Sequence, residues 1–354
     1  MIMNSDGAST QNRAEPVPND VWKRLYATAA KIRAMEPWLW VEETDIFGVK
    51  DPESDAVVFV SVMGLLGEYH AVALYPGAKA LAQFWEMQHK AGSKDVAEML
   101  FEIRQLHAAF GKKNELETIE KRVVKELGLN FKGVNAWPCF RSYRPGYFPW
   151  VINADEARLL LLALEQLLVM APRVKEDRRL VSRKPGKCTY LVRVPHQKDG
   201  VIEWRDEHHE YPPPATSFRI SIPNHLVEAV RKLEPVDLTV EMDVAASVCR
   251  IGKKGDRPQL PYMMLAADSA SLFVLGVELL SVNAEIEDMW CQVPAKFLGM
   301  IVKHGIRPKR LALRTPWVEM VMQGICKDLG IEIIRDPKLK AVTEARRSVE
   351  RFMR

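Results

Sequence analysis

The chain has 354 residues, 47% of them hydrophobic and 27% charged, and its 50 basic and 46 acidic residues leave a formal net charge of +4. This composition is that of an ordinary soluble globular protein, and the length predicts two or three domains. The mild positive charge permits an anionic partner without requiring one, because dedicated nucleic-acid-binding domains concentrate their positive charge.

The cysteines and the apolar segments limit the cellular setting. The five cysteines lie far apart and form no CxxC pair, which argues against a zinc knuckle and, with an odd count, against a complete disulfide framework. Residues 1–20 lack the apolar core of a secretory signal, and the longest apolar helix, expected at 157–171, is too short to span a bilayer. We therefore expect a cytoplasmic protein that does not enter the membrane.

The first part of the chain alternates polar caps with apolar segments. Residues 1–18 have the composition of a disordered tail, and apolar residues at helical spacing between Asn19 and Pro37 predict the first helix. The further elements expected up to Gly128 are a hairpin of buried strands at 56–63 and 69–74 and helices at 78–89, 93–110 and 115–127.

Three segments share one plan, in which a strand is followed by a polar cap and an apolar helix. They are AVALYPGAKALAQFW, FPWVINADEARLLLLALEQ and YMMLAADSASLFVLGVEL. In the second, a strand at 148–152 leads through Asn153-Ala154-Asp155 into a helix at 156–170. In the third, Asp268-Ser269 is expected to cap a helix at 270–280. The plan indicates either a repeated module or a common way of joining strand to helix.

The C-terminal part indicates parallel strands. A strand at 311–314, an N-cap at Thr315-Pro316, a helix at 317–329 and a strand at 331–334 predict a βαβ unit. A hairpin is expected earlier, at 189–194 and 201–204, and a basic helix at 338–354 ends the chain. Together the elements predict a multi-domain α+β protein with mixed sheets. After the tail we expect an N-terminal α+β domain at 19–135, a middle α+β domain at 136–235 and a C-terminal α/β domain at 236–354.

The stretch FRSYRPGYFPW, residues 140–150, is the strongest candidate for a ligand-binding loop. Its arginines could bind a carboxylate or phosphate with both nitrogens, its rings could stack on a flat ligand, and the following helix start offers amide donors. The candidate residues are Arg141, Tyr143, Arg144, Tyr147, Trp150 and Asp155. The alternative is that this loop forms a contact between domains, and that Asp155 is the N-cap of the helix.

No standard catalytic signature or cofactor motif occurs. GKKGD, residues 252–256, lacks the ending of a phosphate-binding loop and fits a hairpin turn, and HExxH and GxSxG are absent. A metal is not expected. The alternative is a site in which His208 or His209 joins His196 and one carboxylate, such as the set His196, His208 and Glu210. Adjacent histidines in an extended segment point to opposite faces, and three prolines after Tyr211 prevent a helix that would regroup them.

A second concentration of positive charge is RVKEDRRLVSRKPGK, residues 173–187. It could contact nucleic acid, although it contains an acidic pair and no aromatic residues between its cations. A solvated linker is the favoured interpretation, and nucleic-acid contact is the alternative.

Three long stretches carry a family resemblance. PWLWVEETDIFGVKDPESDAVVFVSVMGLLGEYHAVALYPG, FRSYRPGYFPWVINADEARLLLLALEQ and GIRPKRLALRTPWVEMVMQGICKDLGIEI resemble an uncharacterised group of bacterial proteins with paired domains of unknown function. The resemblance covers most of the chain from Trp22 onward. It implies a bacterial, cytoplasmic setting and a domain break before the final third of the chain, and it implies no activity, cofactor or catalytic residue.

The sequence therefore favours a non-catalytic binding or interaction protein, because its reactive side chains are dispersed among caps, turns and contacts. Two alternatives remain open. One is a nucleic-acid-associated protein that uses the 141–150 loop and the basic segment, and the other is a metal-dependent hydrolase. The partner is therefore expected to be a protein or a nucleic acid.

Overall fold

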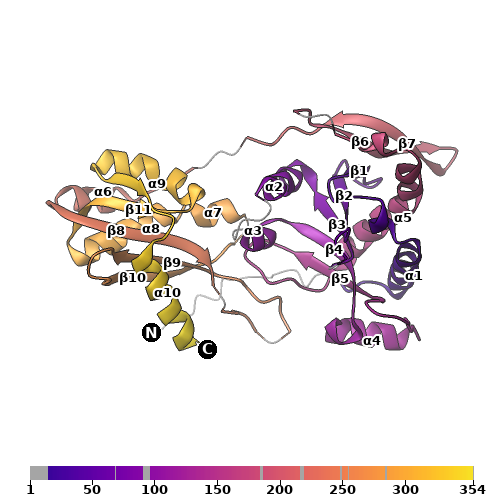
Figure 1. Ribbon diagram of the computed structural model, residues 1–354, viewed down its shortest axis with the longest axis horizontal. Coiled ribbons are helices and arrows are strands. Elements are labelled where there is room, and N and C mark those ends of the chain that lie inside the picture. The colour runs from indigo at the N-terminus through magenta and orange to yellow at the C-terminus, as the bar shows by residue number, and fades with distance from the viewer. Residues whose placement is uncertain are drawn as a thin grey trace, which may run out of the picture. The chain divides into compact units, whose positions relative to one another are not determined.

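The computed structural model describes residues 15–67, 69–90, 96–183, 186–215, 219–247, 249–253, 255–283 and 285–353 (Figure 1). The chain forms two compact units. Unit 1 consists of Met1–Trp85, Arg104–Ser142 and Trp150–Pro213, and unit 2 consists of Glu86–Ile103, Tyr143–Pro149 and Pro214–Arg354. Most of the expected tail, residues 1–14, lies outside the described residues.

The two units differ from the three parts that the sequence predicts. The boundary expected near Asn135 falls inside unit 1, because strands on both sides of it belong to one sheet. The boundary expected near Pro235 falls inside unit 2, which resumes at Pro214, and Pro235 begins the longest strand of that unit.

Unit 1 is built on a seven-stranded sheet with the order β5-β4-β3-β2-β1-β6-β7. The pairing of β1 with β6 is parallel, with Gly48 opposite Val192, and the described pairs β1–β2, β2–β3, β3–β4 and β6–β7 are antiparallel. The strands are β1 (Phe47–Lys50), β2 (Val57–Met63), β3 (Ala71–Pro76), β4 (Gln105–Gly111), β5 (Trp137–Tyr143), β6 (Thr189–Lys198) and β7 (Val201–Glu210).

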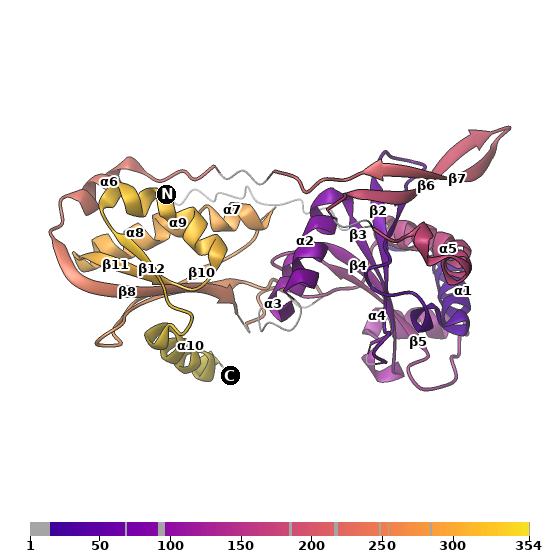
Figure 2. The ribbon, with the colours of Figure 1, turned by 45° about the horizontal axis from the view of Figure 1, so that its top comes forward.

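Helices cover both faces of this sheet, which is why β2 and β3 are buried nearly throughout (Figure 2). On one face lie α1 (Asn19–Met35) and α5 (Ala154–Glu176), whose apolar residues share a core with the sheet. On the other lies α2 (Gly77–His89), where Phe84 packs against Tyr75 with ring centroids 4.8 Å apart. The helix α4 (Thr118–Glu126) precedes β5. The predicted first helix, the first hairpin and the hairpin β6–β7 are confirmed.

Two predictions for this region are wrong. The helix expected at 93–110 is the short helix α3 (Val96–Glu102) followed by β4, because residues 106–109 pair with β3. The strand expected at 148–152 is only an isolated bridge at Trp150, and the strand of this region is β5.

Unit 2 has a five-stranded mixed sheet with the order β10-β9-β8-β11-β12. The strands β8, β9 and β10 form an antiparallel meander, and β8, β11 and β12 are parallel. The predicted βαβ unit is confirmed, since β11 and β12 pair in parallel with Leu311 opposite Ile333. The strands are β8 (Pro235–Ala246), β9 (Tyr262–Asp268), β10 (Val274–Leu280), β11 (Arg307–Leu313) and β12 (Glu332–Arg335).

Four helices cover one face of this sheet and the last helix lies on the other (Figure 2). The glycines Gly305 and Gly330 follow α8 and α9 at positive φ, as a helix C-terminus favours. The first face carries α6 (Asn224–Arg231), α7 (Ile286–Trp290), α8 (Val293–His304) and α9 (Pro316–Leu329), and the second carries α10 (Lys340–Met353).

The third strand–cap–helix module is wrong. Asp268 accepts hydrogen bonds from the backbone N–H groups of Ala270 and Ser271, at 3.2 and 3.1 Å, and this turn leads into strand β10 instead of a helix. Residues 276–280 pair with β9 as its antiparallel neighbour.

The fold is therefore α+β, with mixed sheets in both units. None of the helices in the described part of the chain combines the length and the apolar character that crossing a membrane requires.

Candidate functional site

Arg141 lies at the end of β5 and is committed to the fold of unit 1. Its Nη1 donates to Oε1 of Glu120 at 2.6 Å, and its Nη2 donates to the carbonyl of Glu115 at 3.1 Å. Glu120 is fully buried, and the same oxygen accepts the backbone N–H of Phe140 at 2.9 Å. The guanidinium therefore neutralises a buried carboxylate that also joins α4 to β5.

The rest of the loop is held by backbone pairing. Ser142 and Trp150 exchange two backbone hydrogen bonds of 2.8 and 3.0 Å. Within unit 2, the backbone N–H of Phe148 donates to Pro258, and the guanidinium of Arg257 lies 5.7 Å from the ring centre of Tyr147.

Of the other candidates in this loop, Tyr143 is half-buried and Arg144 is exposed. Arg141 belongs to unit 1 and Arg144 to unit 2, so the candidate residues of this loop are divided between the two units. The ligand-binding role of these residues stays a prediction.

The N-cap of α5 is Asn153, which corrects the assignment of that role to Asp155. The Asn153 side chain accepts a hydrogen bond from the backbone N–H of Glu156 at 2.9 Å. The Glu156 carboxylate in turn accepts one from the backbone N–H of Asn153 at 3.1 Å. Asp155 is exposed in the first helical turn. The N–H of Ala154 donates to the carbonyl of Glu15, so protein groups already occupy amide donors that an anion would need.

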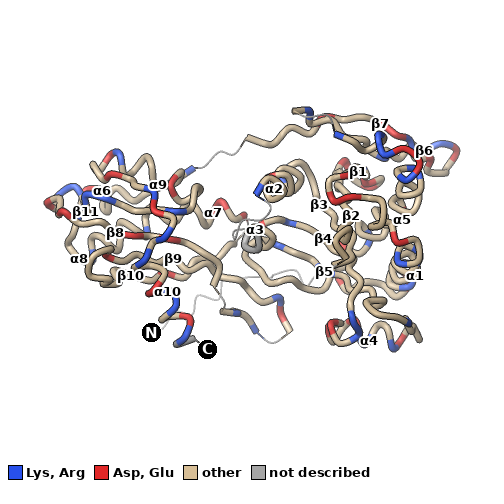
Figure 3. The backbone as a smooth tube through the Cα atoms, viewed as in Figure 1, with Lys and Arg blue, Asp and Glu red and all other residues tan. Residues whose placement is uncertain are grey.

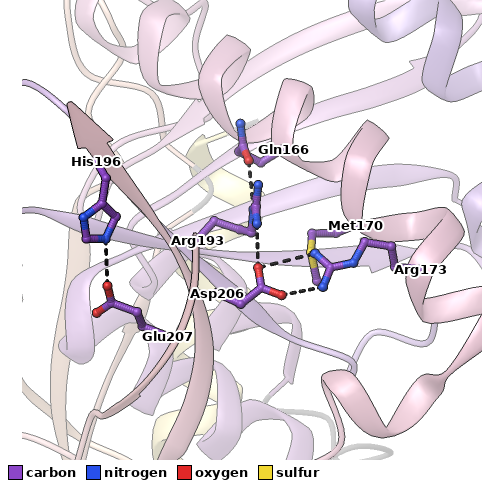
Figure 4. Close-up of polar contacts among 7 residues, drawn as sticks. All are labelled: Gln166, Met170, Arg173, Arg193, His196, Asp206 and Glu207. Carbon is purple, nitrogen blue, oxygen red and sulfur yellow. Dashed lines mark hydrogen bonds and ion pairs between the residues drawn. The ribbon is translucent and has the colours of Figure 1, made fainter. Parts of the chain in front are cut away.

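The hairpin β6–β7 presents two different sets of polar side chains, one on each face (Figure 4). On the face toward α5, Nη1 of Arg193 donates to Asp206 at 2.5 Å and its Nε donates to Gln166 at 3.1 Å. Arg173 on α5 donates to the same Asp206 carboxylate. Arg193 is buried, whereas Asp206 and Arg173 are partly exposed, and the cluster fastens the hairpin to α5.

The opposite face of the hairpin carries a carboxylate between two imidazoles. Glu207 lies 2.9 Å from Nε2 of His196 and 2.9 Å from Nε2 of His209, one histidine at each oxygen. Hydrogen bonds from these histidines lower the pKa of Glu207. The histidine that joins His196 is therefore His209 and not His208.

The predicted metal set of His196, His208 and Glu210 is not brought together. Side chains alternate along a strand, so His208 and Glu210 lie on the face opposite to Glu207. In the described residues, no group of three or more His, Cys, Asp or Glu side chains has an arrangement that could hold a metal ion.

The cations of the basic segment 173–187 contact other groups of unit 1. Lys175 lies 4.4 Å from the ring centre of Trp40, and Arg183 lies 3.9 Å from that of Trp85. Arg178 forms ion pairs with Glu42 at 2.6 Å and with Asp45 at 2.9 Å. Along the nearby hairpin, acidic and basic residues are interleaved (Figure 3). The segment is thus part of the packed unit and not a solvated linker.

Two carboxylates of β8 face α10 in unit 2, and sequence analysis did not single them out. Asp243, 1% exposed, accepts from Arg314, from Arg346 at 2.7 Å and from the hydroxyl of Thr315 at 3.0 Å. Glu241 accepts the backbone N–H of Val342 at 3.1 Å. Both acids therefore hold structural partners, and α10 depends on them.

A groove lies along β10 in unit 2, and it was also missed because this segment was expected to be a helix. The groove has a volume of about 380 Å³, a size within the range of ligand pockets. Residues 275–278 of β10 line one side, and on α8 the lining residues are Ala295, Lys296, Gly299, Met300 and Lys303.

Two glycines shape this groove. A Cβ at Gly276 would come within 2.9 Å of Sδ of Met300, so glycine lets α8 lie close to the strand. A Cβ at Gly299 would meet no atom within 4 Å, so this position leaves the groove open. The side chain of His304 contacts the carbonyl of Leu275 at 2.6 Å, where the pairing of β9 and β10 is irregular.

β10 is the last strand of its sheet, and no described strand pairs with its outer edge. Apolar side chains are unusually exposed here, including Phe273 at 59% and Leu279 at 48%. The others are Leu272, Val274 and Val277. Natural proteins protect strand edges with charges, prolines or covering segments, so an exposed apolar edge indicates an interaction site.

Comparison with known proteins identifies two domains. Residues 22–193 match the model of a domain of unknown function, DUF7309, and residues 226–350 match that of a second, DUF6930. The predicted pairing of such domains is therefore confirmed. The first match covers most of unit 1 together with Glu86–Ile103 and Tyr143–Pro149 of unit 2, and it ends within β6. The second extends from α6 to α10.

No curated protein matches the chain. A chain in a cryo-EM structure of a simian T-cell lymphotropic virus intasome in complex with PP2A regulatory subunit B56 gamma is similar to this one at 15% identity. The likeness covers 40% of this chain and 45% of that chain with a TM-score of 0.25, which is too low to support an argument about fold or function.

Proposed function

We propose that this protein, which pairs two domains of unknown function, is a non-catalytic binding protein that takes an extended segment of a partner protein along β10. The observation that carries the proposal is the free edge of β10 beside the groove under α8. A segment that adds as a further strand gains backbone hydrogen bonds from the edge and side-chain contacts from the groove. This combination needs no reactive group.

The state of the charged side chains supports binding over the alternatives. The buried acids Glu120 and Asp243 and the partly exposed Asp206 hold arginines of the same unit. The nucleic-acid alternative relied on the 141–150 loop and the basic segment, and Arg141 and Arg178 are committed to carboxylates. The hydrolase alternative relied on His208 or His209 joining His196 and a carboxylate. His196 and His209 meet at Glu207, but in the described residues no group of three or more His, Cys, Asp or Glu side chains could hold a metal ion.

The predicted cytoplasmic, bacterial setting belongs to the same proposal. The five cysteines are free thiols, as is usual in reducing compartments.

The test fills the groove without disturbing the fold. Gly299→Leu places a side chain in open space and replaces a helical glycine, so the variant should be at least as stable as the original protein, by up to about 1 kcal/mol. Gly324→Leu in α9 is the matched control, because a Cβ there also meets no atom within 4 Å.

A displayed library of random linear peptides is selected for binding to the full chain. We expect selected peptides that bind the original protein and Gly324→Leu equally and lose binding to Gly299→Leu. If every selected peptide binds Gly299→Leu as well as it binds the control, the groove is not the binding site and the proposal is wrong.

A further inference from the structure

We propose that the segment bound along β10 is an acidic peptide in which acidic and apolar side chains alternate. This inference rests on the proposed function and specifies its partner. The two faces of β10 differ in chemistry, and an added strand must match both of them at once.

The face of β10 toward α8 lies beside two lysines of α8, Lys296 and Lys303. Position 276 faces Met300 of α8, and Glu278 accepts an ion pair from Lys296 at 3.1 Å. Lys303 lies along the same groove and is exposed. An acidic side chain entering this groove would meet two lysines and could compete with Glu278 for one of them.

The other face of β10 is apolar. Val277 and Leu279 alternate with the positions that face α8, so they lie on the side of the sheet that carries α10, and they are 41% and 48% exposed. Apolar side chains from a neighbouring strand would remove them from water at roughly 25 cal/mol per Å² of buried apolar surface.

A strand that pairs with β10 presents its own side chains alternately to these two faces. Every second side chain therefore lies beside the lysines of α8, and the intervening ones lie beside Val277 and Leu279. Cross-strand neighbours on one face interact directly, so opposite charges and apolar pairs stabilise the complex. An alternating acidic and apolar sequence satisfies both faces.

Charge argues against a second copy of this chain as the occupant. Two copies of β10 paired antiparallel are related by an axis perpendicular to the sheet, which keeps both α8 helices on one face. Lys296 and Lys303 of the two copies would then approach one another, and like charges brought together across strands are destabilising. An acidic peptide meets the same lysines as opposite charges.

The experiment measures fluorescence anisotropy of labelled synthetic peptides with the full chain. The first peptide alternates glutamate and valine, and the second has the same composition with the glutamates and valines in separate blocks. In two further peptides, serine or lysine replaces glutamate. We expect the alternating glutamate peptide to bind tightest, with about tenfold weaker binding after Lys303→Glu and at high salt.

Lys327→Glu is the matched control, because Lys327 is an exposed lysine on α9 away from the groove lining. Equal binding of the alternating and blocked peptides would overturn the inference, and so would unchanged binding in Lys303→Glu. If the serine peptide binds as well as the glutamate peptide and Gly299→Leu abolishes both, the acidic preference is wrong and the proposed function stands. If library peptides also ignore Gly299→Leu, the proposed function fails with it.

Discussion

Glu241, in β8, accepts the backbone N–H of Val342 in the first turn of α10 at 3.1 Å, so a strand carboxylate caps the last helix. The residue is 4% exposed. The contact joins two segments that are far apart in the sequence and fixes where α10 begins on the sheet. The same face holds Asp243 with its arginines, so α10 is attached through buried charge as well as through apolar packing.

The pKa of Glu241 provides a prediction about pH. Burial raises this pKa, although the N–H groups of Val342 and Ala341 favour the charged form. Because the pKa is higher in the folded state, the contribution of Glu241 to stability is present below its unfolded pKa and is lost as pH rises through the folded pKa.

Glu241→Gln keeps an acceptor and cannot ionise. Its stability relative to the original protein should therefore increase as pH rises through this window, as measured by urea denaturation at a series of pH values. A difference that stays constant across pH would show that Glu241 does not titrate in this way.

Asp243→Ala should destabilise unit 2 strongly. The substitution leaves Arg314 and Arg346 without their shared carboxylate, and removing one member of a buried ion pair costs about 3–5 kcal/mol. Asp237→Ala is the control. Asp237 lies on β8 like Asp243 and pairs with Arg310 of β11, but its side chain is 70% exposed, so its loss should cost less than about 1 kcal/mol. Equal losses in chemical denaturation would contradict a structural role of the buried cluster.

Arg141→Ala should also lower the free energy of unfolding by about 3–5 kcal/mol, because Glu120 would be left fully buried without its ion-pair partner. Arg144→Ala, at an exposed position of the same loop, should cost less. Thermal denaturation of the two variants checks this order. A larger loss for Arg144→Ala would mean that the exposed arginine, and not the pair with Glu120, stabilises the loop.

His107 predicts a loss of stability in acid. It is 1% exposed on β4, and burial lowers its pKa from 6.5 to about 3. Because the pKa is depressed in the folded state, the contribution of neutral His107 to the free energy of unfolding is present above pH 6.5 and is lost as pH falls toward 3. The expected slope is about 1.4 kcal/mol per pH unit.

His107→Gln cannot take up this proton, so its stability should depend less on pH between these limits. Urea denaturation at several pH values measures both slopes. Identical slopes for the two proteins would assign the acid sensitivity to other groups.

The sequence predicts those elements whose signals are local. The first helix, the first hairpin and the βαβ unit are correct because caps, proline at a helix start and glycines such as Gly305 and Gly330 act within a few residues. The α+β class follows from these elements.

The elements β4 and β10 could not be assigned locally. QLHAAFG and VLGVELL are short apolar runs in which periodicity does not separate strand from helix, and pairing with β3 and β9 decides the outcome. The β-branched residues Val274 and Val277 of β10 were the available signal in the sequence. The groove was missed together with the strand, because only the strand order of the sheet shows that β10 lies at its edge.

The interaction partners of the candidate residues also could not be predicted from the local sequence. Arg141 was a candidate both for a contact that stabilises the fold and for ligand binding, and its partner Glu120 comes from another element of unit 1. The sequence left open whether His208 or His209 would join His196 and a carboxylate. Alternation along β7 places His209 on the same face as Glu207, and the pairing of β6 with β7 brings His196 to that face.

The parallel pairing of β1 with β6 bears on how unit 1 is made. Gly48 pairs with Val192, so β1 can pair with β6 only after most of unit 1 has been synthesised. A fragment that stops at residue 193, where the DUF7309 match ends, would cut β6 short and lack β7. The remaining part of β6 would then be an exposed, unpaired edge of the sheet. The smallest autonomous version of this unit should extend through Pro213.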